Sequence, residues 1–232
     1  MTPRGDRPLP PMAFDDPIDD LGLWCDTGAA DWAFRPALFL DRDGVIVADT
    51  GYLGRAEDVR LLDGAAGAVA RCNGLRIPVV VVTNQSGIAR GYYAWSGFHA
   101  VQAALRAALA AAGARLDAVL ACAYHADGKA PLRHPAHPWR KPDPGMILAA
   151  AERMNLDLSR SWIIGDKAED LATGAAAGLA GGTLVGSDDG ARWQASRLET
   201  ARFVVASAAS LADAVTALLE SGRGVGSAAA RC

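Results

Sequence analysis

The sequence of 232 residues has no apolar segment long enough to cross a membrane. Its strongest β-branched run, Ile77–Val82, is only as long as a strand. The N-terminus carries no apolar core behind its charged residues, so it does not resemble a signal peptide. These absences predict a cytoplasmic protein with no membrane partner.

Paired cysteines and clusters of basic residues are also missing. The four cysteines form no Cys-x-x-Cys pair, which favours reduced thiols in the cytosol; they are Cys25, Cys72, Cys122 and Cys232. The net charge is −3 and no lysine or arginine run occurs, so no nucleic-acid partner is indicated. Only three of the 23 basic residues are lysines, namely Lys129, Lys141 and Lys167. A position that keeps lysine in such a chain is a candidate for a compact ammonium group.

The remaining composition is that of a globular protein, with 51% hydrophobic and 21% charged residues. Residues 1–35, rich in Pro and Asp, predict an N-terminal extension that packs on the domain. Residues 36–220 predict the domain itself, and the Gly/Ala/Ser-rich residues 221–232 predict a flexible tail. We expect a monomer.

Apolar strand-like runs alternate with helical patterns along the domain. Strands are predicted at 37–40, 77–82, 116–123, 162–164, 183–185 and 203–205. Helices are predicted within 59–75, at 98–112 and 144–154, after 164 through 179, and at 210–219. This alternation predicts an α/β fold with a doubly wound, mostly parallel sheet and no large cap domain. Ligands of such sheets bind at the carboxyl ends of the strands.

Polar residues follow the predicted strands at four places. They are Asp41-Arg42-Asp43-Gly44, Thr83-Asn84-Gln85-Ser86-Gly87, Arg140-Lys141-Pro142 and Gly165-Asp166-Lys167-Ala168-Glu169-Asp170. Each motif alone is weak, since an isolated Asp-x-Asp is more often a solvated turn. All four in this order, each at the same edge of the sheet, indicate an active site.

The chemistry of phosphoryl transfer explains this set of residues. Asp41 can attack phosphorus as a nucleophile if cations screen the charge of the phosphate. Asp43 can protonate the leaving oxygen and later deprotonate water. Asp41, the backbone carbonyl of Asp43 and Asp166 are a plausible ligand set for Mg²⁺. The hydroxyl of Thr83, the backbone amide of Asn84 and the ammonium of Lys141 can bind the phosphoryl oxygens; they complete the predicted site.

These four motifs resemble those of haloacid-dehalogenase-superfamily phosphatases. Within that superfamily they are most similar to the phosphatases of D-glycero-D-manno-heptose 1,7-bisphosphate, from about residue 37 to residue 185. The resemblance implies that Asp49-Thr50-Gly51-Tyr52 lines the substrate pocket, although the family more often has histidine where Thr50 stands. It also implies substrate contacts from Asn84, Gln85, Ser86, Arg140 and Lys167, and phosphoryl stabilisation by Lys141. Lys167 is alternatively a surface partner of Asp166.

The resemblance implies a magnesium-dependent phosphomonoester hydrolase that works through an aspartyl-phosphate. The implied reaction removes the 7-phosphate of the heptose bisphosphate, a step toward activated heptose for lipopolysaccharide. Histidinol phosphate or another small phosphomonoester is an alternative substrate. A non-catalytic phosphate-binding protein is an alternative of another class, but binding alone does not need both Asp41 and Asp43.

Cys122, His125, His134 and His137 have a spacing that could hold tetrahedral zinc. The zinc loop of the resembled family is Cys-x-His followed by Cys-x-Cys. Here Tyr124 stands at the first histidine position, and His137 and Trp139 stand at the two cysteine positions. The alternative is a metal-free loop stiffened by prolines at 131, 135 and 138, and the broken pattern favours it.

Overall fold

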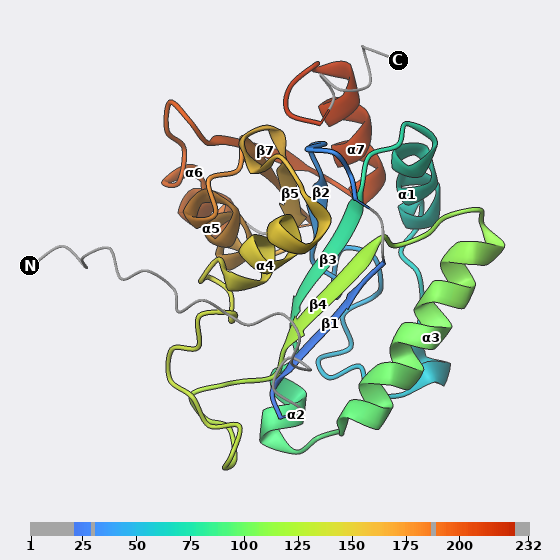
Figure 1. Ribbon diagram of the computed structural model, residues 1–232, viewed down its shortest axis with the longest axis vertical. Helices are drawn as coiled ribbons and strands as arrows, with labels where there is room; N and C mark the ends of the chain where they lie inside the picture. The colour runs from blue at the N-terminus through green and yellow to red at the C-terminus, as the bar shows by residue number, and fades with distance from the viewer. Residues whose placement is uncertain (1–20, 29–30, 187–188, 226–232) are drawn as a thin grey trace, which may run out of the picture.

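Short apolar runs rich in valine and isoleucine form a seven-stranded sheet in the computed structural model, which describes residues 21–28, 31–186 and 189–225 (Figure 1). The strand order is β1-β4-β3-β2-β5-β6-β7, and only β1 runs antiparallel to its neighbour. The strands are β1 (Leu23–Thr27), β2 (Leu38–Leu40), β3 (Val79–Asn84), β4 (Ala118–Cys122), β5 (Trp162–Gly165), β6 (Gly181–Val185) and β7 (Val204–Ala208).

Helices cover both faces of the sheet. The apolar sides of α1 (Ala65–Gly74), α3 (Trp95–Ala111) and α7 (Leu211–Glu220) pack in one layer of the core (Figure 1). The opposite layer contains α4 (Gly145–Met154), α5 (Ala168–Ala176) and α6 (Asp189–Ser196). A short helix, α2 (Ser86–Arg90), begins directly after β3, and two 3-10 turns lie at Ala56–Asp58 and Leu158–Arg160.

The chain winds in two directions from the centre of the sheet. It passes from β2 to β3 and β4 on one side, then crosses to β5, β6 and β7 on the other. The switch point therefore lies between β2 and β5, and ligands of such sheets bind in the crevice expected there, outside the carboxyl ends of the strands. Residues 41–78, which join β2 to β3, hold only loops, one 3-10 turn and α1. The predicted doubly wound α/β fold without a large cap domain is confirmed.

The central strand β2 is buried on both faces. Leu38 and Leu40 belong to the layer of α1, α3 and α7, whereas Phe39 belongs to the opposite layer. Each of these side chains is at most 1% exposed, and burying a side chain of this size contributes about 1.5–3 kcal/mol. Asp41 thus follows a strand that the core holds rigidly.

Three elements were not predicted from the sequence. β1 lies within the predicted extension and pairs with β4, from Leu23 opposite Cys122 to Thr27 opposite Ala118. The short helices α2 and α6 were also missed. Within the segment 221–232, which the sequence predicts to be a tail, Val225 is fully buried in the core. Residues 226–232 of that tail lie outside the described residues.

The structure also shows the helices that bear on membrane insertion and the state of three cysteines. Among the residues described, no helix combines the length and the apolar character needed to cross a membrane. Cys25, Cys72 and Cys122 are thiols and form no disulfide, and Cys232 is outside the described residues.

Candidate active site

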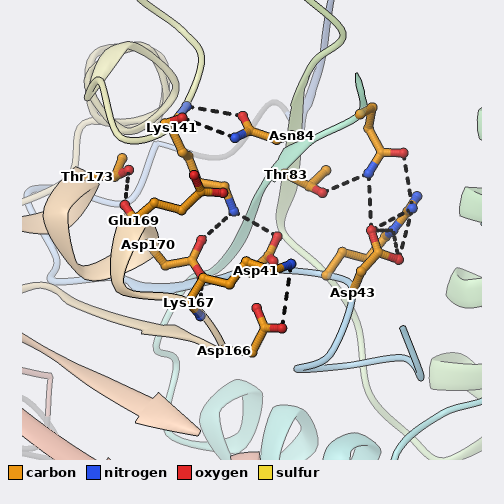
Figure 2. A network of polar contacts seen from close by, with 12 residues as sticks. Asp41, Asp43, Thr83, Asn84, Lys141, Asp166, Lys167, Glu169, Asp170 and Thr173 are labelled. Atoms are coloured by element: carbon orange, nitrogen blue, oxygen red, sulfur yellow. Dashed lines mark hydrogen bonds and ion pairs between the residues drawn. The ribbon is translucent and has the colours of Figure 1, made fainter. Parts of the chain in front are cut away.

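Three carboxylates meet at the switch point of the sheet (Figure 2). Asp41 follows β2, Asp166 follows β5, and Asp170 lies in the first turn of α5. One oxygen from each lies within 4.8 Å of the others. The parallel pairing of β2 with β5 brings them together, and the backbone N–H of Asp41 donates to the carbonyl of Ile164 at 3.0 Å. The structure therefore joins two of the predicted motifs at one point.

Lys141 places a buried cation beside this cluster. Its Nζ lies 2.9 Å from Oδ1 of Asp41 and 2.5 Å from Oδ1 of Asp170, and the residue is 2% exposed. Burial alone would lower the pKa of Lys141, but the attraction of Asp170 and Asp41 outweighs it and raises the pKa above its ordinary value. The ammonium is therefore charged at neutral pH, as a phosphoryl-binding group must be.

The side chain of Asn84 holds the backbone of Lys141. Oδ1 of Asn84 accepts from the N–H of Lys141 at 3.1 Å, and Nδ2 donates to its carbonyl at 3.2 Å (Figure 2). This reciprocal pair links the end of β3 to the loop before α4. The side chain of Asn84 thus positions a lysine, and the phosphoryl contact predicted for the backbone amide of Asn84 stays a prediction.

A second network surrounds Asp43 on the other side of Asp41. The Nε and Nη2 atoms of Arg42 donate to both carboxylate oxygens of Asp43 at 2.9–3.2 Å. Arg42 is completely buried, whereas the Asp43 side chain is 20% exposed. Asp43 is therefore the member of this pair that faces the crevice. Gln85 completes the network by contacting Arg42, Asp43 and Thr83.

The carboxylates fit a divalent cation. Asp166 lies against the loop after Asp43, since a Cβ on Gly44 would sit 2.5 Å from Oδ2 of Asp166, and Gly44 has φ +78°. Burial raises the pKa of Asp166 against the opposing effect of Lys167, and the charge of Asp41 raises it further. Bound Mg²⁺ would relieve this repulsion among carboxylates, and oxygen ligands are those it prefers.

Lys167 and the loop after β2 line the exposed side of the crevice. Nζ of Lys167 lies 3.6 Å from Asp166 and 3.8 Å from Asp49, and its side chain is 52% exposed. Oδ1 of Asp49 accepts from the N–H of Gly51 at 2.7 Å, which shapes the turn. Thr50 is exposed, as are its neighbours Asp49 and Gly51.

Aromatic and cationic side chains gather next to this loop. Tyr52 packs on Tyr92 with ring centroids 4.3 Å apart and ring planes tilted by 33°, and its hydroxyl accepts from Nη1 of Arg90 at 2.7 Å. Nη2 of Arg90 lies 3.1 Å from Nε2 of His125. Burial lowers the pKa of His125, and the charges of Arg140 and Arg90 lower it further. Arg90 and Arg140 thus form a cationic pair beside His125.

Arg140 lies in a turn before Pro142, because the N–H of Arg140 donates to the carbonyl of His137 at 2.9 Å. Arg140 and Lys141 reach different partners. Nη1 of Arg140 donates to the carbonyl of Tyr124 at 3.1 Å, whereas Lys141 turns toward Asp41. Ser86, also a predicted contact, is half-buried at the start of α2.

Within the described part of the chain, the four residues of the disfavoured zinc set are not grouped as metal-ligating side chains. The only group of three or more metal-ligating side chains found among the described residues is that of Asp41, Asp166 and Asp170. Nδ1 of His125, of His134 and of His137 each accepts a backbone N–H two residues further along the chain. His137 also stacks on Tyr124 with centroids 4.3 Å apart. Cys122 is a buried residue of β4.

We expect the purified protein to contain no stoichiometric zinc. Three of the ring nitrogens already accept hydrogen bonds, and a stacked Tyr124 occupies the space beside His137. Elemental analysis by inductively coupled plasma mass spectrometry measures this directly. About one zinc per chain would contradict the expectation and would promote Cys122 and the three histidines to ligands.

Four residues of the site were not named as functional from the sequence. Asp170 lies three residues after Lys167, and its place in that motif was the available signal. Arg42 stands between the two motif aspartates, but its position in the motif does not show which partner its side chain binds. Nothing in the sequence pattern marks Arg90 or Tyr93, because tertiary contacts bring them to the site.

The chain matches known protein families over most of its length. The profile of the haloacid dehalogenase-like hydrolases matches residues 23–178, and that of the HAD-hydrolase-like family matches residues 138–222. A D-glycero-β-D-manno-heptose-1,7-bisphosphate 7-phosphatase of Mesorhizobium japonicum is 49% identical over 171 residues, which cover 73% of this chain and 79% of the relative. A second enzyme of that name, from Rhodopseudomonas palustris, is 40% identical over 66% of this chain and 86% of its own length.

Solved structures show the same similarity in three dimensions. A HAD-like phosphatase from Mesorhizobium loti superposes with a TM-score of 0.78 at 42% identity, covering 87% of this chain and 95% of its own. The D,D-heptose 1,7-bisphosphate phosphatase of B. bronchiseptica, solved with magnesium and phosphate, gives a TM-score of 0.69 at 30% identity, over 80% of this chain and 99% of its own. The chain is therefore a phosphatase that belongs to the haloacid dehalogenase-like hydrolases.

Proposed function

We propose that this phosphatase hydrolyses a sugar phosphate through an aspartyl-phosphate on Asp41, with Mg²⁺ as its cofactor. The observation that carries the proposal is the meeting of Asp41, Asp166 and Lys141 at the switch point of the sheet. A nucleophile, an oxygen ligand for a cation and a buried ammonium lie together there. Phosphoryl transfer requires this combination, because catalysis depends on positioning and on screening negative charge.

The residues then act in two half-reactions. An oxygen of Asp41 attacks phosphorus, the bond from phosphorus to the sugar oxygen breaks, and Asp43 gives that oxygen a proton. Water then attacks the phosphorus of the aspartyl-phosphate and gives a proton to Asp43. The bond from phosphorus to Asp41 breaks, which releases phosphate and restores the carboxylate. Lys141 and Thr83 hold the phosphoryl oxygens during both steps.

Asp41, the carbonyl of Asp43 and Asp166 would hold the magnesium ion. When bound, the ion supplies positive charge that offsets repulsion between the phosphate and the attacking carboxylate.

We expect a chelator to lower turnover at least about 100-fold and added Mg²⁺ to restore it. Mg²⁺ should also raise the thermal midpoint, because it binds only the folded carboxylate cluster. In Asp166→Asn the magnesium concentration for half-maximal activity should rise by about 10–100-fold. Asp63→Asn, which changes an exposed aspartate outside the site, is the matched control. Full activity of exhaustively chelated enzyme would refute the cofactor assignment.

The proposed substrate is D-glycero-D-manno-heptose 1,7-bisphosphate, from which the enzyme would remove the 7-phosphate. Relatives at 49% and 40% identity carry that name. The cationic pair of Arg90 and Arg140 supports the assignment, since a bisphosphate brings a second anion that must rest outside the carboxylate cluster. Histidinol phosphate carries a cationic amine instead, which these arginines would repel. This favours a sugar bisphosphate.

We expect Arg140→Ala to lower kcat/KM for the heptose bisphosphate by about 10–100-fold, with little change for a generic aryl phosphate. The physical reason is that the lost guanidinium contacts only the part of the substrate far from the reacting phosphorus. Steady-state rates on both substrates measure the effect, with Arg202→Ala as the control because Arg202 is exposed and belongs to no predicted motif. Equal losses on both substrates, or faster wild-type turnover of histidinol phosphate, would show that the substrate assignment is wrong.

A further inference from the structure

Gln85 has its whole side-chain amide bound within the protein. The residue is 2% exposed. Its Oε1 accepts from Nη2 of Arg42 at 3.1 Å and from the hydroxyl of Tyr93 at 2.6 Å. Its Nε2 donates to Oδ2 of Asp43 at 3.3 Å and to Oγ1 of Thr83 at 2.8 Å. An amide offers two donor hydrogens and two acceptor lone pairs. All four are in use within the protein.

The chemistry of the neighbours determines which end of the amide is which. A guanidinium can only donate hydrogen bonds, and an ionised carboxylate can only accept them. Arg42 therefore requires the amide oxygen on its side in either protonation state of Asp43, and the ionised form of Asp43 requires the amide nitrogen. The Arg42–Asp43 pair, joined by contacts of 2.9–3.2 Å, leaves no alternative orientation.

This orientation determines the direction of the Thr83 hydroxyl. Because Nε2 of Gln85 donates to Oγ1 of Thr83, the hydroxyl oxygen serves as the acceptor in that bond. The hydrogen of Thr83 then has to point elsewhere. Thr83 is the penultimate residue of β3, on the side of Asp41 where Asp43 lies (Figure 2), and it is 1% exposed. In the proposed function, the acceptor for this hydrogen is a phosphoryl oxygen bound at Asp41.

We propose that Gln85 is a positioning residue. The Arg42–Asp43 ion pair fixes the orientation of its amide, so that Nε2 of Gln85 donates to Thr83 and the Thr83 hydroxyl donates to the phosphoryl group. This rests on the proposed function, in which Thr83 binds the phosphoryl oxygens. The oriented Thr83 hydroxyl is a preorganised hydrogen-bond donor, and such donors stabilise most strongly the charge that develops in the transition state. In this proposal Gln85 acts on the phosphoryl group through Thr83 and does not itself bind that group.

The test is a double-mutant cycle between Gln85→Glu and Thr83→Val. Glutamate keeps an oxygen for Arg42 and Tyr93 but replaces the donor nitrogen with an acceptor, so the Thr83 hydroxyl turns toward it and away from the substrate. We expect each single variant to lose about 30-fold in kcat/KM for an aryl phosphate and a similar factor in inhibition by orthovanadate. The double variant should be no more than about threefold worse than the worse single variant.

A conservative variant separates this role from simple structural support. Thr83→Ser keeps the hydroxyl and should retain most of the activity when Gln85 is present. In the Gln85→Glu background Thr83→Ser and Thr83→Val should be equally impaired, because the hydroxyl no longer faces the substrate. Gln102→Leu is the matched control, since this second buried glutamine forms no side-chain hydrogen bond among the residues described.

The outcome decides between the alternatives. A double variant about 1000-fold impaired, which is the product of the two single losses, overturns the proposal. Full activity of Gln85→Glu also overturns it. If Gln85→Glu does not fold, the same cycle with Gln85→Leu applies, and additive losses there are equally decisive. A failure of this cycle leaves the nucleophile assignment intact, because that assignment is tested separately by substitution of Asp41.

Discussion

Asp41→Asn should abolish turnover, with a loss of at least about 10⁴-fold in kcat. Asparagine preserves the shape of the side chain but offers no anionic oxygen to attack phosphorus. No covalent phosphoenzyme should form, which rapid-quench experiments with a radiolabelled substrate measure directly. Asp43→Asn should behave differently and slow both half-reactions without removing the nucleophile. Substantial activity of Asp41→Asn would refute the assignment of the nucleophile.

The same substitution should not destabilise the metal-free protein. Asp41 is one of three carboxylates whose oxygens lie within 4.8 Å of one another. Removing one negative charge relieves repulsion with Asp166, and Lys141 keeps its contact with Asp170 at 2.5 Å. We therefore expect an unchanged or higher thermal midpoint in the presence of a chelator. A variant that is both inactive and strongly destabilised would show that Asp41 has a structural role.

Lys141→Met should impair both stability and activity. Lys141 is the buried cation between Asp41 and Asp170, at 2.9 and 2.5 Å. Removing one partner of a buried ion pair costs about 3–5 kcal/mol, because the remaining charges stay buried without compensation. Denaturant unfolding in the absence of metal measures this loss. The rate should fall about 10²–10³-fold, because the phosphoryl oxygens lose a preorganised cation.

Lys167→Met is the matched control for this experiment. Lys167 also lies beside the cluster, but its side chain is 52% exposed and its Nζ is 3.6 Å from Asp166. Water screens such a pair, so its removal should change stability by less than about 1 kcal/mol. If the two lysine variants lose the same stability, burial of Lys141 is not the reason for its effect.

The sequence alone determined the fold class and the positions of the four motifs. A strand buried on both faces reads as a continuous apolar run, and polar residues at its end stand out against it. Leu38–Leu40 followed by Asp41 has this pattern, and so does Trp162–Gly165 followed by Asp166. Because parallel strands end at the same edge of a sheet, the motifs could be placed in one crevice before any contact was known.

Element bounds and edge structure were harder to predict. β1 carries the sequence Leu-Trp-Cys-Asp-Thr, which has no strong alternation, and its strand conformation comes from pairing with β4. The helix α2 has only five residues, which is too short for a periodic apolar pattern to be visible.

Only the tertiary structure decided what each polar side chain contacts. The sequence placed Asn84 and Gln85 in the predicted substrate site. The structure adds that the side chain of Asn84 holds the backbone of Lys141, whereas the side chain of Gln85 joins Arg42, Asp43 and Thr83. Their spacing after β3 shows which edge of the sheet they occupy, but not their hydrogen-bond partners.

The physical reason is that a motif specifies a backbone position, whereas a side-chain contact depends on residues far away in the chain. Arg90 meets His125 across 35 positions, and Lys141 meets Asp170 across 29. Strand order and loop packing create these contacts. A hydrogen bond needs its donor and acceptor within about 3 Å and in line, and no periodicity in the sequence encodes that geometry.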